Sequence, residues 1–189
     1  MKETQESEVR ETEGKELPAP QGIGMAVAVD WGIAAQILLT PIIYPIFGRS
    51  NPIKISGLNP ALGMVLFFVI ACLVACVPAF FGEMIRRGRN WALRIQIVAS
   101  ALLSLAGIFS LVNVYRSVTG GNFWPLVTEV ILVIISPLIV WRLSRPSTIR
   151  WFKEVTVAEA SKRHGGRWIW FIALCALIGG LLQTIATIK

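Results

Sequence analysis

Two acidic residues, Asp30 and Glu129, stand inside long apolar stretches of this sequence. A carboxyl group is costly to place in hydrocarbon, so an acidic residue there is a candidate for binding a proton or a cation. A structural role is also open to each residue. Glu129 can reach Arg116 or the external membrane interface and pair two helices, and Asp30 in "DWGIA" can cap a helix start beside an interfacial Trp31. We expect the structural roles and keep ion binding as the alternative.

No other group of residues has the types and spacing that catalysis or metal binding needs. Cys72 and Cys76 lie one helical turn apart, but a metal site would need two more ligands. His164 lies in a polar stretch with no second ligand nearby, so we expect it to be solvated. The sequence has no G-x-S-x-G or H-E-x-x-H motif, no phosphate-binding glycine loop and no paired carboxylates. We therefore predict no catalytic residue, no metal ligand, no cofactor and no enzyme activity.

The elements that must position Asp30 and Glu129 are membrane helices. Hydrophobic residues make up 54% of the 189 residues and charged residues only 15%, with a mean hydropathy of +0.65, which is too apolar for an ordinary soluble domain. About 20 apolar residues form a helix that crosses the roughly 30 Å hydrocarbon layer. Apolar runs of that length without two-residue alternation favour helices over a barrel. The predicted fold is an all-α integral membrane bundle with five spans at about 23–47, 61–81, 92–115, 123–141 and 168–188.

The beginning of the chain differs sharply from the rest. Residues 1–21 include six Glu and almost no apolar side chain, so they cannot bury enough surface to offset the entropy lost on ordering. We predict a disordered acidic cytoplasmic tail over 1–21 and a single transmembrane domain over 22–189. A secretory signal is not expected, because such a signal starts with basic residues and an early apolar core.

A further short helix is expected after the fourth span, in "RPSTIRWFKEV". Ile149, Phe152 and Val155 share one helical face, and the charged residues between them point elsewhere. Pro146 fits the first turn of a helix, where its missing N–H would have no partner. We predict an interfacial helix over about 147–160 that lies in the plane of the lipid headgroups.

Basic residues are divided unequally between the two sides of the predicted bundle. The N-terminal tail, the turn before the third span and the 142–167 connection carry 14 Lys and Arg, against 4 on the other side. Cytoplasmic segments carry the excess of Lys and Arg, which predicts a cytoplasmic N-terminus and an extracytoplasmic C-terminus in a cell inner membrane. The candidate contacts to lipid headgroups are Arg86, Arg87, Arg89, Arg142, Arg145 and Arg150.

Small residues recur at one-turn spacing in three spans, which is typical of faces where helices approach closely. These residues are Ala71 and Ala75, Ser100, Ser104 and Gly107, and Ala176 and Gly180. Prolines inside three spans can kink their helices, and broken helices can line ion sites in transporters. These prolines are Pro41, Pro45, Pro78 and Pro137. We predict packing faces and kinks, with contacts within one chain or between chains both left open.

The segment "RRGRNWALR", a span, a turn, another span and then "RLSRPSTIRWF" resemble a pattern found in uncharacterised multi-pass membrane proteins of bacteria. In these proteins an R-x-G-R-x-W-A-like helix start is followed by a span that ends in a Leu-x-Arg/Lys-Pro-x-x-x-x-Trp/Tyr-Phe-like segment. The resemblance covers about residues 82–155 and implies a bacterial membrane protein. It implies no activity, and no functional residue is transferred.

The sequence as a whole favours a membrane protein without catalytic activity that acts as an accessory or interaction subunit. Its expected partners are the lipid bilayer, anionic headgroups, and either another membrane protein or a second copy of the chain. The net charge of +7 does not indicate nucleic acid, because the basic residues flank apolar runs. The alternative is a small transporter or channel that uses Asp30 or Glu129. A weaker third hypothesis is an enzyme acting on lipid or quinone, with Arg86, Arg87 and Arg89 holding a phosphate.

Overall fold

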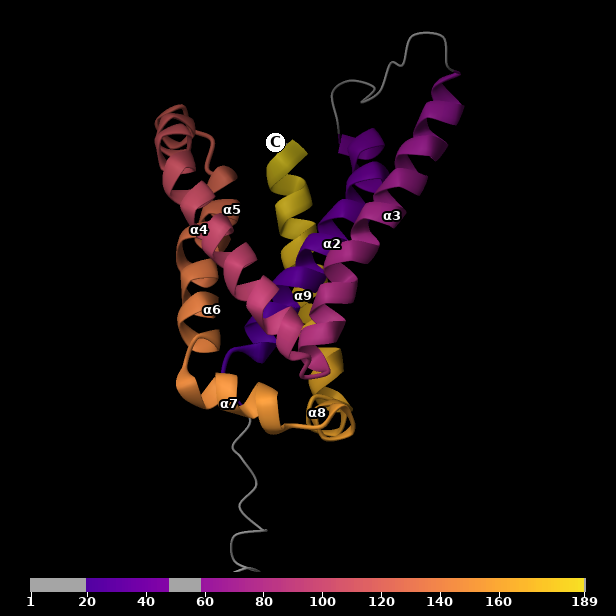
Figure 1. The fold of residues 1–189 in the computed structure, drawn as a ribbon. Helices are drawn as coiled ribbons and strands as arrows, with labels where there is room; N and C mark the ends of the chain where they lie inside the picture. The colour runs from indigo at the N-terminus through magenta and orange to yellow at the C-terminus, as the bar shows by residue number, and fades with distance from the viewer. Residues whose placement is uncertain (1–19, 48–58, 189) are drawn as a thin grey trace, which may run out of the picture.

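The computed structural model describes residues 20–47 and 59–188, and all its regular elements are helices (Figure 1). Their bounds are α2 (Ile23–Phe47), α3 (Pro60–Arg86), α4 (Asn90–Thr119), α5 (Pro125–Glu129), the π-helix η1 (Val130–Ile135), α6 (Ser136–Leu143), α7 (Pro146–Glu154), α8 (Val157–Arg163) and α9 (Arg167–Ile188). Helices α5, η1 and α6 continue into one another and form a single span over Pro125–Leu143.

Five helical units are long and apolar enough to cross a membrane, which confirms the predicted fold class. They are α2, α3, α4, the continuous α5–η1–α6 span and α9. The chain is therefore a multi-pass integral membrane protein. Of the predicted tail, residues 1–19 lie outside the described residues. Gln21 is described, and its side-chain oxygen accepts a hydrogen bond from Arg142.

Helix α2 is the centre of the bundle. It packs along α9 and along α3, whereas α4 packs against the α5–η1–α6 span. In Figure 1 these two groups of helices come together near α7 and α8 and diverge toward the opposite end, where the C-terminus lies. We call the end formed by α7, α8 and the turn between α3 and α4 the basic end. Among the described residues, Arg116 is the one Lys or Arg placed toward the other end.

The buried apolar core lies at the basic end. It includes residues of every span and of both short helices, and the fully buried Trp151 of α7 is its largest side chain. Gly88, in the turn between α3 and α4, has a φ of +71°, and a Cβ there would lie 2.9 Å from Val155 and 3.1 Å from Ala160. Glycine is therefore required at this turn both by its backbone conformation and by the closeness of α7 and α8.

The short helix predicted over about 147–160 is two helices. Helix α7 ends at Glu154, and α8 begins after Thr156, whose hydroxyl accepts a hydrogen bond from the Glu159 N–H at 3.3 Å. A threonine that caps a new helix start takes an extended backbone conformation, which interrupts the helix before it. The apolar face was predicted correctly in α7, because Phe152 is buried in the core.

Helices α2 and α9 approach so closely that only a glycine fits between them. A Cβ at Gly180 would lie 2.7 Å from the Gly32 carbonyl oxygen, 2.7 Å from the Ala35 Cβ and 2.9 Å from the Gln36 nitrogen. Two of these atoms belong to the backbone and cannot move aside alone. The predicted small-residue face around Ala176 and Gly180 is therefore a contact within the chain.

The fourth span contains the π-helix η1 immediately before Pro137. The Ser136 N–H and its hydroxyl, at 2.9 Å, both bind the carbonyl of Ile131, five residues earlier. Proline has no N–H and its ring collides with the carbonyl four residues earlier, here that of Val133, so a wider turn relieves the collision. At the other prolines within spans, α2 and α3 continue as α-helix.

Replacing Gly180 with alanine should weaken the α2–α9 contact. The G180A variant should lose about 1–3 kcal/mol of unfolding free energy, because the added methyl group forces backbone atoms apart. The measurement is denaturant titration of purified protein in mild detergent. The matched control is G179A on the same helix, where an added Cβ meets nothing within 4 Å. Equal stability of the two variants would contradict the close contact.

Candidate functional site

Both acidic residues singled out in the sequence are buried inside spans. Asp30 and Glu129 are each only 7% exposed. Helix α2 begins at Ile23, so Asp30 lies two turns inside the helix, about 10 Å along its axis. The prediction that Asp30 caps the helix start is therefore wrong, because the apolar residues before it already belong to the same helix.

Asp30 lies where α2 meets α3 and α4. One oxygen, Oδ1, accepts a hydrogen bond from the side-chain amide of Gln96 at 3.0 Å, and Oδ2 is buried without a partner. Helix α3 comes close through Gly82, where a Cβ would lie 3.2 Å from the Asp30 Cβ and 2.7 Å from the Trp31 ring. A buried carboxyl group thus has one neutral partner and no cation beside it.

Glu129, the last residue of α5, faces α4. Its Oε2 lies 2.6 Å from the hydroxyl oxygen of Ser110, which in turn lies 2.8 Å from the carbonyl oxygen of Gly107. The other carboxyl oxygen, Oε1, is buried without a partner. Arg116 is exposed and forms no ion pair with Glu129, so that expected pairing is wrong. On α4 the two positions 110 and 116 are turned about 120° apart, so Arg116 does not share the face that carries Ser110.

The partners of both carboxyl groups lie on one face of α4. Gln96, Ser100, Ser104, Gly107 and Ser110 follow one another at three- or four-residue steps, which places them on the same side of the helix. Gln96 and Ser100 are 4% and 2% exposed, so this face is turned into the bundle. The sequence predicted a packing face here, and the structure adds that its two ends bind Asp30 and Glu129.

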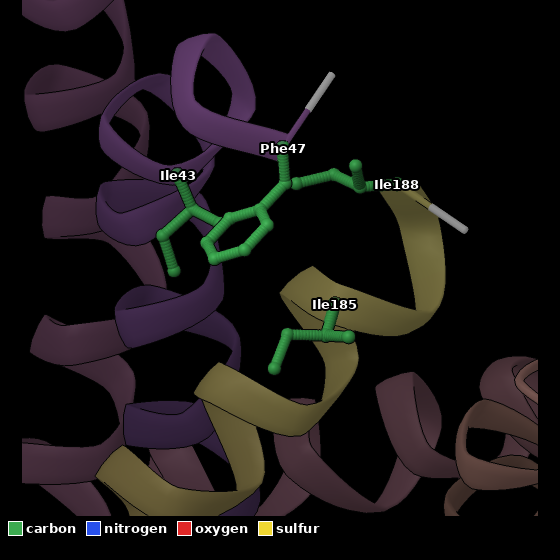
Figure 2. Close-up of a pocket in the computed structure, with 4 residues that line it drawn as sticks. All are labelled: Ile43, Phe47, Ile185 and Ile188. Atoms are coloured by element: carbon green, nitrogen blue, oxygen red, sulfur yellow. The ribbon is translucent and has the colours of Figure 1, made fainter. Parts of the chain in front are cut away.

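A cavity of about 230 Å³ lies between α2, η1 and α9. Its one polar side chain is Gln183 of α9, and the other lining residues are Met25, Ala28, Val29, Gly32, Ile131, Ile135, Cys175 and Gly179. Figure 2 shows a smaller cavity of about 100 Å³ at the far end of α2 and α9, enclosed by Ile43, Phe47, Ile185 and Ile188. Neither cavity is lined by an acidic residue. The candidate ion-binding groups are therefore Asp30 of α2 and Glu129 of α5, whose partners lie on α4.

At the basic end, two of the predicted lipid-binding arginines form ion pairs with a carboxylate of the chain. Arg86 and Arg87 both bind the carboxylate of Glu83, with N···O distances of 2.6 Å. Arg86 also donates a hydrogen bond of 3.2 Å to the carbonyl of His164. Arg86 therefore holds the end of α3 against the turn after α8, whereas Arg87, among the described residues, binds only Glu83, within four residues of itself. Both ion pairs leave these arginines less available for a headgroup.

Of the other four arginines, Arg142 and Arg145 are half-buried beside Trp141, and Arg142 also donates a hydrogen bond to Gln21. Arg142 and Arg145 lie over the ring of Trp141, with the guanidinium carbon 5.2 Å and 4.1 Å from the ring centroid. Trp141 is 54% exposed, so this stack of side chains lies on the surface. Arg89 and Arg150 are exposed. The geometry suits a membrane interface, where an aromatic ring and basic groups share one depth.

His164 is buried, so the prediction that it is solvated is wrong. The imidazole packs against Trp151 and Trp168, with ring centroids 5.7 Å and 4.9 Å apart, and only 5% of the residue is exposed. Burial lowers the pKa of His164 below its usual 6.5, and the nearby guanidinium groups of Arg86 and Arg163 act in the same direction. The histidine is therefore held in its neutral form among aromatic rings.

Two residues of the site, Gln96 and Ser110, were missed in the sequence, and the burial of His164 was not predicted. Gln96 is a polar side chain inside an apolar run, which is itself a signal, because an amide in a membrane interior needs a hydrogen-bond partner. Ser110 shares the helical face of Gln96 but looks like an ordinary packing serine. His164 is surrounded by polar sequence neighbours, and only the three-dimensional packing of tryptophans covers it.

Comparisons of the chain with protein-family models, with curated proteins and with solved structures gave no match. Within residues 20–47 and 59–188, no three His, Cys, Asp or Glu side chains come together as a metal site would require.

The burial of His164 predicts a loss of stability in acid. In the denatured chain the imidazole takes up a proton below pH 6.5, whereas in the folded protein it resists protonation. The stabilisation by His164 should therefore be complete above pH 6.5 and be lost as the pH falls toward the lowered folded pKa. The measurement is the difference in unfolding free energy between wild type and H164F across this range. A difference that does not change with pH would contradict the buried neutral histidine.

Proposed function

We propose that the chain is a small ion-coupled membrane transporter or channel in which Asp30 and Glu129 bind the transported cation. The observation that carries this proposal is the burial of both carboxyl groups inside spans, each with an oxygen that has no partner. Acidic residues in membrane helices usually pair with a cation or serve an ion pathway. Neither residue forms an ion pair within the described part of the chain, which favours the second role.

The free energy of burial supports the same conclusion. An isolated ionised carboxylate in a medium of low dielectric constant is so unfavourable that the group takes up a proton or a cation instead. Asp30 and Glu129 each keep one neutral hydrogen-bond partner, Gln96 and Ser110, which can accommodate both a charged and a neutral carboxyl group. Such a group can bind and release an ion without breaking an ion pair.

The two carboxyl groups also lie at different depths. Their partners on α4 are 14 residues apart, which corresponds to about 21 Å along a helix, compared with a hydrocarbon layer of roughly 30 Å. Asp30 is near the basic end and Glu129 toward the other end. One ion-binding group thus lies toward each side of the membrane, and the polar side of α4 connects them. This arrangement suits the stepwise passage of an ion across the bilayer.

We place the basic end in the cytoplasm and the protein in the inner membrane of a bacterium. The unequal distribution of Lys and Arg supports the orientation, and the resemblance described above supports the source. At that end, the half-buried arginines beside Trp141 are proposed to bind anionic headgroups, each worth up to about 1 kcal/mol. We assign no catalytic activity.

A second candidate function, an accessory subunit of a membrane assembly, is favoured by the exposure of α3. Only 11% of its most apolar segment is buried, compared with 33% for α2. Most of α3 therefore contacts either lipid or a partner. Purification in mild detergent at native expression level, followed by mass spectrometry of bound proteins, tests this candidate, and stoichiometric partner subunits would support it.

Neutral substitutions of the two buried carboxyl groups should abolish ion flux. Purified protein in liposomes, with a pH-sensitive dye inside and a membrane potential applied, should acidify the interior faster than protein-free vesicles. D30N and E129Q should each reduce the rate to that background, because neither amide can bind and release a cation. The matched control is E154Q, which removes an exposed carboxyl group at the end of α7. Unchanged flux in both variants, or no flux in wild type with any cation, would favour the accessory function.

Removing the Arg145 guanidinium, which stacks on Trp141, should weaken the binding of anionic lipid. R145A should lower the affinity for phosphatidylglycerol about fivefold, which corresponds to about 1 kcal/mol per basic group. Native mass spectrometry of protein with bound phosphatidylglycerol or phosphatidylcholine measures the change. The control is R116A, an exposed arginine toward the other end. Equal loss in both variants would contradict a specific headgroup site at the basic end.

A further inference from the structure

We infer that the coupled ion is a proton, and that Glu129 binds it as a carboxylic acid whose O–H donates to Ser110. The role of this proton in transport rests on the proposed function, whereas its presence on Glu129 rests on the contacts of Ser110 alone.

The Ser110 hydroxyl has two close oxygen neighbours and only one hydrogen. Its Oγ lies 2.6 Å from Glu129 Oε2 and 2.8 Å from the Gly107 carbonyl oxygen. Both distances are those of full O–H···O hydrogen bonds, and neither the carbonyl nor an ionised carboxylate can donate. If Glu129 were ionised, the single hydrogen of the Ser110 hydroxyl could serve only one of the two contacts. The other contact would then bring two acceptor oxygens together with no hydrogen between them. With Glu129 protonated, its O–H donates to Ser110 and the Ser110 O–H donates to Gly107.

The second carboxyl oxygen agrees with this arrangement. Glu129 Oε1 is buried without a hydrogen-bond partner. An orphan oxygen of an ionised carboxylate costs much more than the carbonyl oxygen of a neutral acid. The contacts of Asp30 do not distinguish its two protonation states, because the Gln96 amide donates equally well to an ionised or a protonated Asp30.

The distances do not suit a calcium-sized cation bridging these oxygens in this arrangement. Oxygen ligands at about 2.3–2.6 Å from a cation, arranged as in an octahedron, lie more than about 3.2 Å from one another. The Ser110 oxygen is much closer than that to both Glu129 and Gly107. A hydrogen atom fits between these oxygens, whereas a calcium-sized ion does not.

No charged side chain beside Glu129 opposes this assignment. Helix α5 packs against α4 and α9 and continues into η1. Among the described residues of these elements, α9 has no charged residue beyond Arg167 at the basic end, and η1 has none. On α4 the nearest cation is Arg116, which is exposed and forms no ion pair with Glu129. Glu129 is therefore surrounded by neutral groups.

Release of the proton requires only a rotation of the Ser110 hydroxyl. When the proton leaves Glu129, the Ser110 O–H turns from the Gly107 carbonyl to the carboxylate and becomes its donor. No covalent bond other than the O–H bond of the acid is broken, and the proton passes to water or to the next acceptor. Ser110 is thus a hydrogen-bond partner that suits both states of Glu129.

Infrared difference spectroscopy of the purified full chain at neutral pH tests the inference. The spectrum of wild type minus E129Q should contain a carboxylic acid C=O stretching band that shifts in D₂O. In S110A this band should move to higher frequency, because the acid loses its acceptor, whereas S110T should leave it in place. If E129Q does not fold, the S110A-minus-wild-type spectrum reports the same band.

The outcomes separate this inference from the proposed function. Carboxylate bands alone in the difference spectrum, with no acid band, would overturn the proton assignment even if E129Q abolishes ion flux. An acid band sensitive to S110A supports it even if liposomes show no flux, and in that case only the transport proposal fails. An acid band unaffected by S110A would also overturn it, because the inferred donor bond to Ser110 would then be absent.

Discussion

The close contact of α2 with α9 on one side and α3 on the other determines where the ionisable groups lie. Between membrane helices there is no hydrophobic driving force, so association depends on backbones that approach closely. Gly180 permits this approach to α9, and Gly82 permits it to α3, where Trp31 lies across the gap. With α2 enclosed on both sides, Asp30 is held in the interior and cannot reach the membrane surface. The burial of a carboxyl group is thus a consequence of glycines on other helices.

The five spans were predictable because length and hydropathy alone define them. The observed bounds of α2 and α9 agree with the predicted spans to within a residue, since apolar runs end where the bilayer ends. Hydropathy gives no rotation of a helix about its axis, however, so it does not say which side of a span faces the interior. For this reason the sequence paired Glu129 with Arg116, which is close along the chain but on another face of α4. Asp30 was misplaced along the helix instead, because the apolar residues before it already belong to α2.

The polar partners of the buried carboxyl groups could be identified only in the folded structure, for a different reason. Gln96 and Asp30 are 66 residues apart, and the contact between them exists only once α4 crosses α2. His164 shows the opposite case, because its sequence neighbours are polar while its spatial neighbours are two tryptophans from α7 and α9. The break between α7 and α8 was signalled locally by Thr156, yet an amphipathic pattern running across it indicated one helix. Local capping residues outweigh a continuous apolar face when the chain must turn.

The π-helix connects the Glu129 site to the shape of the fourth span. It begins at the residue after Glu129 and ends just before Pro137, whose missing N–H and bulky ring favour the wider turn. At its centre, Leu132 lies so close to α4 that a Cβ at Gly107 would be 2.6 Å from the Leu132 Cβ. The Gly107 carbonyl is also the group that Ser110 releases when Glu129 loses its proton. The protonation of Glu129 and the packing of the π-helix therefore both act on the turn of α4 around Gly107. A change in the hydrogen bonds of Glu129 must be accommodated by the packing of η1 against that turn.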